Sequence, residues 1–561
     1  MTGKDALLAL ESLRAKTGGA AAAEKRACLA VLARRSLRGA RAVERLHEAL
    51  CFLRAYPDDE RILADVAAML ARFSRRPDLR RHRRALESSG IAGTAIRFSF
   101  YAGTARWLAA RWGNRLTVDW KAFVNREALE RVFPLIALFA ETPGLDELDL
   151  GVRGWVKRLK GPRETDASFL VRRLATLGRD AFENEWAYEG LDLPLVLAPG
   201  KGGPSRTRAA IGVPAVSFQT APLDSGRPDV AREVASPPLR VVAATGDEAG
   251  RLLDLARESM VTRQRDLDVF QWGDRRDVRL AHFPDGLTFV VIGAVPERRL
   301  LLESVYGFLT LKNGVPVGYV LVSALFESSE IAYNVFETFR GGESGRIYGK
   351  VLALSRHLFG PDVFTIFPYQ LGGYGNPEAL DSGAWWFYQK LGFRPRAPHV
   401  AKLMEEELAR MKADPRHRST RATLKVLASE NLYFHLGKER DDAIGLLELP
   451  NVGLRVTDML ARRFGSDRER AEAVLNLEAR DLLGLRSLSG WSQGERLAFR
   501  RWAPLVAILP HLARWSLAEK RALAAVVRAK GGRRESDFVR LFDRHRKLRR
   551  AIAALAKAEP A

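Results

Sequence analysis

The stretch from residue 331 to residue 393 constrains the fold more than any other part of this sequence. It reads as a strand (331–336), a glycine-rich turn (340–346), a helix, a second strand (363–369) and a second helix that ends near Phe393. The spacing of the first helix places Ile347, Val351, Leu354 and Leu358 on one apolar face. A strand that enters a helix through such a turn presents several backbone N–H groups at the positive end of the helix. The pattern therefore predicts a phosphate-binding turn inside an α/β segment.

The chain as a whole is long and strongly basic. At 561 residues it exceeds what one hydrophobic core supports, so we expect two to four domains. The net charge of +23 favours contact with a polyanion, such as RNA, DNA, an anionic membrane surface or an acidic protein. A solvated arginine-rich surface explains the same charge, and both interpretations stay open.

Composition divides the chain into four parts. Residues 1–198 have helical spacing, and 199–238 hold seven prolines and five glycines, which is a linker composition. Residues 239–405 alternate strand and helix patterns and include Asn313-Gly314 between apolar runs, a strong hairpin signal. Residues 406–561 return to helix. Lysine and arginine balance aspartate and glutamate between 239 and 405, so the helical flanks carry the net charge.

Two flanking segments bear on nucleic-acid binding. Residues 72–84 contain seven arginines and one acid, Asp78, which suits a phosphate-binding surface or an ordinary solvated helix face, and we favour the solvated face. Residues 101–123 interleave aromatic and basic side chains, as a surface that stacks bases can do. A helix that buries its tryptophans produces the same pattern, and we favour that interpretation.

Other classes of site are not indicated by the sequence. Cys28 and Cys51 stand outside any Cys/His cluster, so neither a disulfide framework nor a zinc site is expected. No apolar run approaches about 18 residues, and the N-terminus lacks the apolar segment of a secretory signal. We expect no membrane span, no metal and a cytoplasmic location.

The second helix carries a resemblance to a known family. Residues 381–393, Asp-Ser-Gly-Ala-Trp-Trp-Phe-Tyr-Gln-Lys-Leu-Gly-Phe, resemble the last-helix motif of the GCN5-related N-acetyltransferases (GNAT superfamily), in which an Asn, an Ala, a Tyr and Lys-x-Gly-Phe recur at this spacing. The turn 340–346 resembles their pyrophosphate motif, Gln/Arg-x-x-Gly-x-Gly/Ala. Glu343 stands where that motif has its first glycine, and Asp381 replaces the Asn. The resemblance covers residues 239–405.

The resemblance implies an α+β fold: a GNAT-like acyltransferase domain, with a mixed and mostly antiparallel sheet that splays apart to admit acyl-CoA, flanked by all-α regions. It implies acetyl-CoA as co-substrate and N-acyl transfer to an amine of an unknown, possibly macromolecular acceptor. Tyr388 matches the tyrosine that often protonates the departing thiolate, and Glu337 and Glu330, followed by Glu327, are the candidates for general base. The implied CoA-binding residues are Arg340, Gly341, Gly342, Glu343, Ser344, Gly345, Arg346 and Asp381.

Two other hypotheses remain open at this point. Glu343 could block CoA, which would leave a degenerate domain within a basic helical scaffold that binds nucleic acid. Alternatively, the same fold could use aminoacyl-tRNA as its donor, which would also account for the positive charge.

Overall fold

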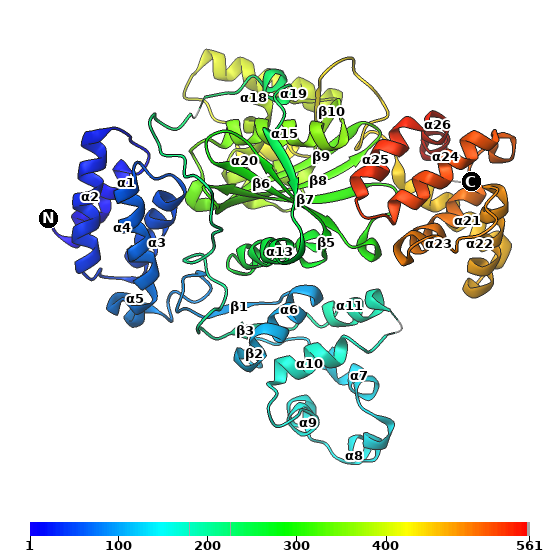
Figure 1. Cartoon of the computed structure of the whole chain (residues 1–561), viewed down its shortest axis with the longest axis horizontal. Helices are drawn as coiled ribbons and strands as arrows, with labels where there is room; N and C mark the ends of the chain where they lie inside the picture. Colours follow the sequence, from blue (N-terminus) through cyan, green and yellow to red (C-terminus); the bar gives the residue numbers. More distant parts are fainter. Residues whose placement is uncertain (179, 225, 558–561) are drawn as a thin grey trace. The chain divides into compact units, whose positions relative to one another are not determined.

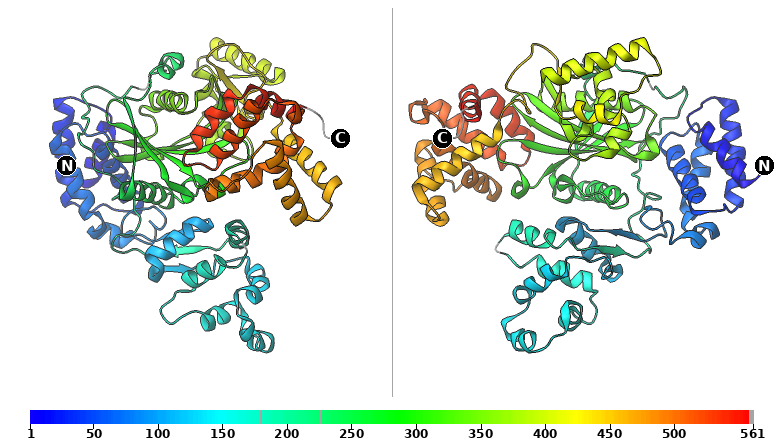
Figure 2. Two further views of the ribbon diagram at one scale, coloured as in Figure 1. Left: turned by 45° about the vertical axis from the view of Figure 1, so that its right-hand side comes forward. Right: turned by 180° about the vertical axis from the view of Figure 1, so that it is seen from behind.

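The computed structural model describes residues 1–178, 180–224 and 226–557 of a mixed α+β chain, 54% helix and 12% strand (Figures 1 and 2). The chain separates into two compact units. The first contains Met1–Leu223, Gly250–Trp272 and Leu311–Val317, and the second contains Asp224–Ala249, Gly273–Thr310 and Gly318–Ala561. None of the helices in the described residues is long and apolar enough to cross a membrane.

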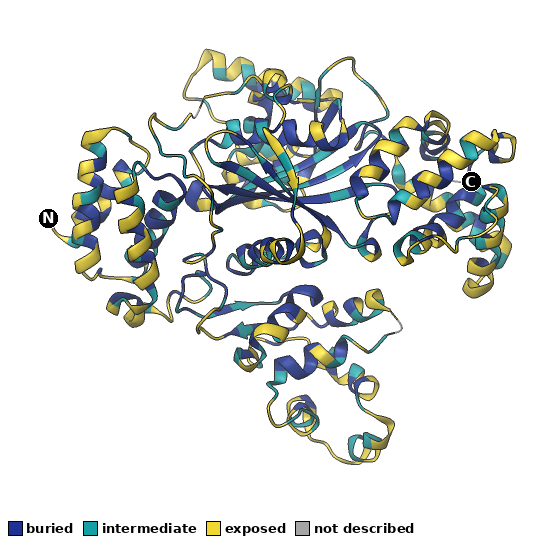
Figure 3. Cartoon of the chain, in the orientation of Figure 1, coloured by how far each residue is buried: buried dark blue, intermediate teal, exposed yellow. Residues whose placement is uncertain are grey.

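A helical bundle begins the first unit. Its helices are α1 (Gly3–Leu13), α2 (Gly19–Arg34), α3 (Ala40–Ala55), α4 (Glu60–Arg72) and α5 (Pro77–His82). Val43, Leu46 and Leu50 of α3 are fully buried, because residues three and four positions apart share one helix face. Figure 3 shows the consequence: each helix has a buried inner side and an exposed outer side.

The rest of the first unit corrects the expectation that this region is all-helical. The short strands β1 (Ile96–Phe98), β2 (Leu116–Val118) and β3 (Leu195–Leu197) form a sheet in the order β1-β3-β2. Each strand has three residues, too few for an alternating pattern to appear in the sequence. Around them lie α6 (Ala102–Trp112), α7 (Arg126–Ile136), α8 (Thr142–Glu147), α9 (Gly151–Leu159), α10 (Asp166–Leu174), α11 (Ala181–Glu189) and α14 (Asp268–Gln271). Trp107 and Trp112 are buried, as the core interpretation of that segment predicts.

Nine strands of the described residues form the large sheet, in the order β11-β12-β10-β9-β8-β7-β6-β5-β4. They are β4 (Arg240–Ala243), β5 (Gly273–His282), β6 (Leu287–Ala294), β7 (Ser304–Lys312), β8 (Val315–Leu325), β9 (Ser328–Val335), β10 (Val363–Ile366), β11 (Arg394–Pro395) and β12 (Leu432–His435). The sheet is mostly antiparallel, and β9 and β10 are a parallel pair. The predicted hairpin is confirmed: Asn313 and Gly314 join β7 to β8 with φ of 48° and 76°, as the two-residue turn requires.

The parallel pair is connected by helix α15 (Ser344–Phe359). Its apolar face (Ile347, Val351, Leu354 and Leu358) is buried, as the spacing predicts. The helix ends at Gly360, whose φ of 78° is the left-handed conformation common after a helix. The other helices before residue 391 are α12 (Val230–Val234), α13 (Gly246–Val261), α16 (Pro368–Leu371), α17 (Pro377–Asp381) and α18 (Ala384–Lys390).

The C-terminal region also departs from the all-α expectation, because β12 lies in it and pairs with β10. This strand has four residues, and the sequence gives it no distinctive alternation. The helices are α19 (Pro398–Ala413), α20 (Arg421–Leu427), α21 (Leu449–Phe464), α22 (Arg468–Leu482), α23 (Gln493–Ile508), α24 (Leu517–Lys530), α25 (Glu535–Arg544) and α26 (Arg546–Lys557).

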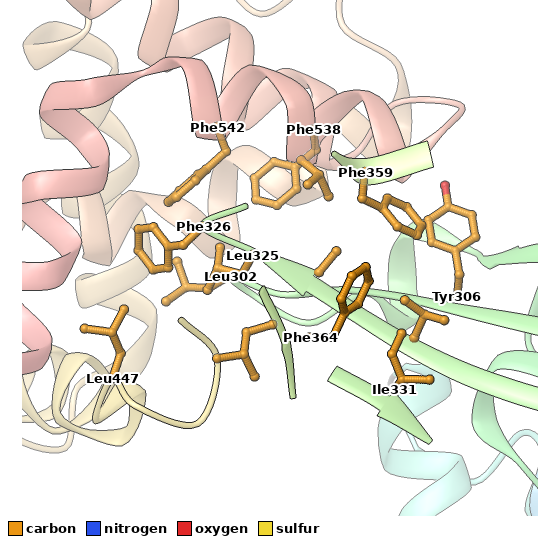
Figure 4. Packing of buried hydrophobic residues seen from close by; sticks show 14 of the residues in the cluster. Leu302, Tyr306, Leu325, Phe326, Ile331, Phe359, Phe364, Leu447, Phe538 and Phe542 are labelled. Carbon is orange, nitrogen blue, oxygen red and sulfur yellow. The ribbon is translucent and has the colours of Figure 1, made fainter. Parts of the chain in front are cut away.

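These helices share one hydrophobic core with the sheet. Figure 4 shows Phe542 of α25 beside Phe326, which follows β8, and their ring centroids are 5.5 Å apart. Phe538 of the same helix is also fully buried. The C-terminal helices are therefore part of the fold of the second unit and not an appendage to it.

We predict that Phe542→Ala lowers the free energy of unfolding by about 3–5 kcal/mol, since it removes a fully buried aromatic ring. Leu541→Ala, on the same helix at 37% exposure, should cost less than about 0.5 kcal/mol. Urea denaturation of both variants is the measurement. Equal losses of unfolding free energy in the two variants would contradict a core shared by α25 and the sheet.

Candidate functional site

The large sheet opens between β9 and β10. The two strands pair at Ser328–Val363, Ser329–Phe364 and Glu330–Thr365, and the pairing stops there. β9 nevertheless continues to Val335, paired along its whole length with β8 on its other side. Beyond Glu330, the edge of β9 that faced β10 therefore has no strand partner among the described residues. Such an edge offers backbone donors and acceptors to an extended ligand.

The glycine-rich turn follows β9 directly, after a short 3-10 turn (Glu337–Phe339), and leads into α15. Gly341 has a φ of 79°, a conformation that favours glycine. Among the described residues, the backbone N–H groups of Gly341, Gly342, Ser344 and Gly345 have no hydrogen-bond acceptor. Together with the positive end of the helix dipole, they form a set of donors suited to an anion.

Glu343 lies at the start of α15 and is almost fully buried. Its carboxylate is turned toward Arg346, with Oε1 3.4 Å from Nη1. Arg346 also pairs with Asp285, and Arg340 pairs with Glu378 of α17. Both arginines of the turn therefore have acidic partners within the protein.

Asp381 is exposed at the end of α17, where its carboxylate pairs with Arg421 at 2.8 Å. In the described residues no hydrogen bond or ion pair links it to the turn 340–346. The α17 residue that does reach the turn is Glu378, through Arg340. The sequence motif had drawn attention to Asp381 alone.

The segment before β4 packs against the first turns of α15. A Cβ atom on Gly345 would lie 3.1 Å from Cδ of Pro228, so this glycine permits a close approach of the two segments. Farther along α15, Lys350 pairs with Glu233 of α12 at 2.6 Å. Sequence reasoning treated residues 199–238 as a linker, but part of it borders the candidate site.

Tyr388 is 3% exposed, and its ring packs edge-on against Tyr348 of α15, with 5.5 Å between the centroids. The Tyr348 hydroxyl is buried and has no hydrogen-bond partner among the described residues. Burial raises the pKa of both side chains well above the ordinary value for tyrosine. An unpaired buried hydroxyl costs about 1–3 kcal/mol, so the Tyr348 hydroxyl, beside the ring of Tyr388, indicates a place where a ligand completes the hydrogen bonding. The sequence analysis did not select Tyr348. Its position in the second turn of α15, the helix that follows the glycine-rich loop, is the signal that could have identified it.

The candidate bases differ in their surroundings. Glu330 is half-buried at the last paired row of β9 and β10, where burial and then the negative charge of Glu303 raise its pKa to about 7. Glu337 is exposed. Glu327 forms ion pairs with Arg440 and with Arg549, at 3.4 Å and 2.8 Å. A carboxyl that titrates near neutral pH suits a general base, and Glu330 has that property.

The alternation of side chains along β9 places these groups on opposite faces of the strand. Tyr333 points toward α15, since its hydroxyl donates to the carbonyl of Ser344 at 3.2 Å. Its ring lies 5.3 Å from that of Tyr348. Glu330, three positions away, therefore faces the other side. The tyrosines and the carboxylate therefore lie on opposite faces of the sheet beside the opening between β9 and β10.

Comparison of the chain with family models, with curated proteins and with solved structures found no match. Within the described residues, no group of three or more His, Cys, Asp or Glu side chains is arranged to hold a metal ion.

We predict that Glu330 makes stability depend on pH. Its pKa is raised from 4.5 to about 7, so between these values the folded chain holds a proton that the unfolded chain has lost. Stability should therefore fall as the pH rises through this window. Glu330→Gln removes this pH-dependent loss of stability. The free energy of unfolding of the variant, relative to that of the unaltered protein, should therefore increase between pH 5 and pH 8.

Urea denaturation at the two pH values measures the difference. Other buried acids contribute equally to both proteins, so the comparison isolates residue 330. Glu337→Gln, at an exposed position, is the matched control and should behave alike at both pH values. A pH-independent effect of Glu330→Gln would show that this carboxyl titrates normally.

Proposed function

We propose that the chain is an acyl-CoA-dependent N-acyltransferase, with acetyl-CoA as donor and an amine as acceptor. The observation that carries the proposal is the separation of β9 from β10 directly before a glycine-rich turn in which the N–H groups of Gly341, Gly342, Ser344 and Gly345 have no acceptor among the described residues. An opening of this kind is what the sequence resemblance implies for acyl-CoA, and it supports the proposal.

The donor fits this opening part by part. The pantetheine arm of CoA is extended and contains two amides, so it can hydrogen-bond to the unpaired edge of β9 beyond Glu330. Its diphosphate would lie at the start of α15, where Gly342, Ser344 and Gly345 supply N–H donors. The thioester then lies at the point where the two strands part.

In the reaction a C–N bond forms between the acceptor nitrogen and the acyl carbon, and the C–S bond of the thioester breaks. Glu330 takes the proton that the nitrogen loses and passes it to water. Its pKa of about 7 allows it to be ionised and still basic at neutral pH. The departing thiolate takes one proton from water, so charge and atoms balance.

Tyr388 and Tyr348 have a different role from the base. Because burial raises their pKa values far above the ordinary one, the hydroxyls hold their protons firmly. They act as hydrogen-bond donors to the sulfur as negative charge develops on it, rather than as full proton donors. Stabilisation of developing charge by fixed donors is a large term in such reactions.

Calorimetric titration with acetyl-CoA tests the proposal. We expect saturable binding, and we expect Glu343→Gln to tighten it about fivefold, since removing one negative charge near two phosphates is worth about 1 kcal/mol. Glu337→Gln, which removes an exposed acid outside the turn, should leave the affinity unchanged. Absence of heat at millimolar acetyl-CoA for all three proteins would refute the proposal.

The tyrosines give a prediction with two readouts. Tyr388→Phe should lower the rate of transfer about 100-fold, the typical effect of losing one donor to developing charge. Tyr348→Phe should lower the rate in the same direction. It should also leave stability unchanged or raise it by up to about 1 kcal/mol, because it removes an unsatisfied buried hydroxyl. Thiol release from acetyl-CoA with polyamines and lysine peptides as acceptors measures the rate.

Tyr433→Phe is the matched control in the same unit. Its hydroxyl donates to the carbonyl of Gly445 at 2.8 Å, so its loss should cost about 1 kcal/mol of stability and leave transfer unaltered. If Tyr388→Phe instead destabilises the protein and transfer proceeds at the normal rate, Tyr388 serves packing only.

A further inference from the structure

The helical bundle of the first unit carries two runs of exposed arginines. One run spans the end of α2 and the start of α3, and the other spans the end of α4 and α5. Together they form what we call the arginine surface: Arg34, Arg35, Arg38, Arg41, Arg72, Arg75, Arg80, Arg81, Arg83 and Arg84. All ten side chains are exposed, and none has an ion pair or side-chain hydrogen bond among the described residues.

Specific contacts hold the two runs side by side. Asp78 accepts a hydrogen bond from the N–H of Leu37 at 2.9 Å, and Arg76 donates to the carbonyls of Leu32 and Arg35, each at 2.9 Å. Arg76 and Asp78 also pair with each other at 2.7 Å. Asp78 is the one acid in residues 34–41 and 72–84, and it is fully buried. No exposed carboxylate in these runs offsets the ten positive charges.

This arrangement differs from the rest of the bundle. Elsewhere in the bundle several basic side chains have acidic partners, as in Lys25 with Asp58 at 2.8 Å and Arg26 with Asp59 at 2.9 Å. Repulsion among ten unpaired guanidinium groups opposes folding. A polyanionic partner would relieve this repulsion, so the concentration of these groups favours such a partner.

The chemistry of the surface narrows the class of partner. Guanidinium groups match phosphate oxygens through paired N–H donors, which makes arginine the preferred residue for nucleic-acid backbones. Between Leu8 and Tyr101 no large hydrophobic side chain is exposed. The surface therefore lacks aromatic platforms for unstacked bases and apolar groups for insertion into a bilayer.

We propose that the arginine surface binds the sugar-phosphate backbone of a nucleic-acid duplex without sequence preference. The surface belongs to the first unit, so this proposal does not depend on acyl transfer by the second.

Fluorescence anisotropy of the full chain with labelled duplexes of about two helical turns, one of DNA and one of RNA, tests the proposal. The logarithm of the binding constant should fall linearly with the logarithm of salt concentration, by about 0.9 per phosphate contact on DNA. Replacing Arg34, Arg38, Arg80 and Arg81 with glutamine should reduce that slope by about 3 to 4 and weaken binding at least tenfold at 0.1 M salt. Comparison of the DNA duplex with the RNA duplex shows which of the two nucleic acids the arginine surface binds.

The matched control replaces Arg462, Arg468, Arg470 and Arg486 with glutamine. These side chains are also exposed, and the change in net charge is identical, so binding should stay within about twofold. A further variant with lysine at positions 34, 38, 80 and 81 keeps the charge and should keep the salt slope. The lysine variant shows whether the glutamine variant loses binding through lost charge or through a folding defect. The melting temperature of the glutamine variant reports such a defect directly.

Three results would overturn the proposal. The first is an equal loss of binding in the glutamine variant and the control, which would indicate net charge alone. The second is binding that does not depend on salt, or no binding to either duplex. The third is binding to phosphatidylserine vesicles with none to the duplexes, which would identify a membrane as the partner.

Discussion

The pairing of β9 with β10 stops after three residues, and much of the second unit is arranged around that interruption. A strand edge left without a partner usually invites association with another chain, and proteins cover or shorten such edges. Here β8 supports β9 on one side, and α15 packs behind it through Tyr333 and Ser344. These contacts hold β9 in place beyond the last residue that pairs with β10, so the opening between the two strands is part of the folded structure.

The local patterns of the sequence predicted the parts of this framework that depend on near neighbours. The turn at Asn313-Gly314 and the buried face of α15 follow from spacing and from the backbone preferences of glycine, and both are confirmed. The strands β1, β2, β3 and β12 were missed, since three or four residues carry no period and pairing with distant segments decides their conformation.

The candidate site shows the same division. The turn 340–346 and Tyr388 were visible as a motif, because their chemistry lies in consecutive residues. The distinction between Glu330 and Glu337 was not visible in the sequence. It depends on burial and on the charge of Glu303, which lies near Glu330 only in the folded chain. Tyr348 was overlooked for the same reason: a tyrosine inside a helix looks like core until its hydroxyl proves to have no partner.

The core shared between the sheet and α25 limits how this protein can be divided. Phe542 comes from the last quarter of the chain and packs on Phe326, which follows β8, so the hydrophobic core is complete only after residues 535–544 have been synthesised. On the ribosome, this core would wait for the C-terminal helices. A gene fusion that separates α25 from the sheet removes this contact, so we expect the two to be inherited together.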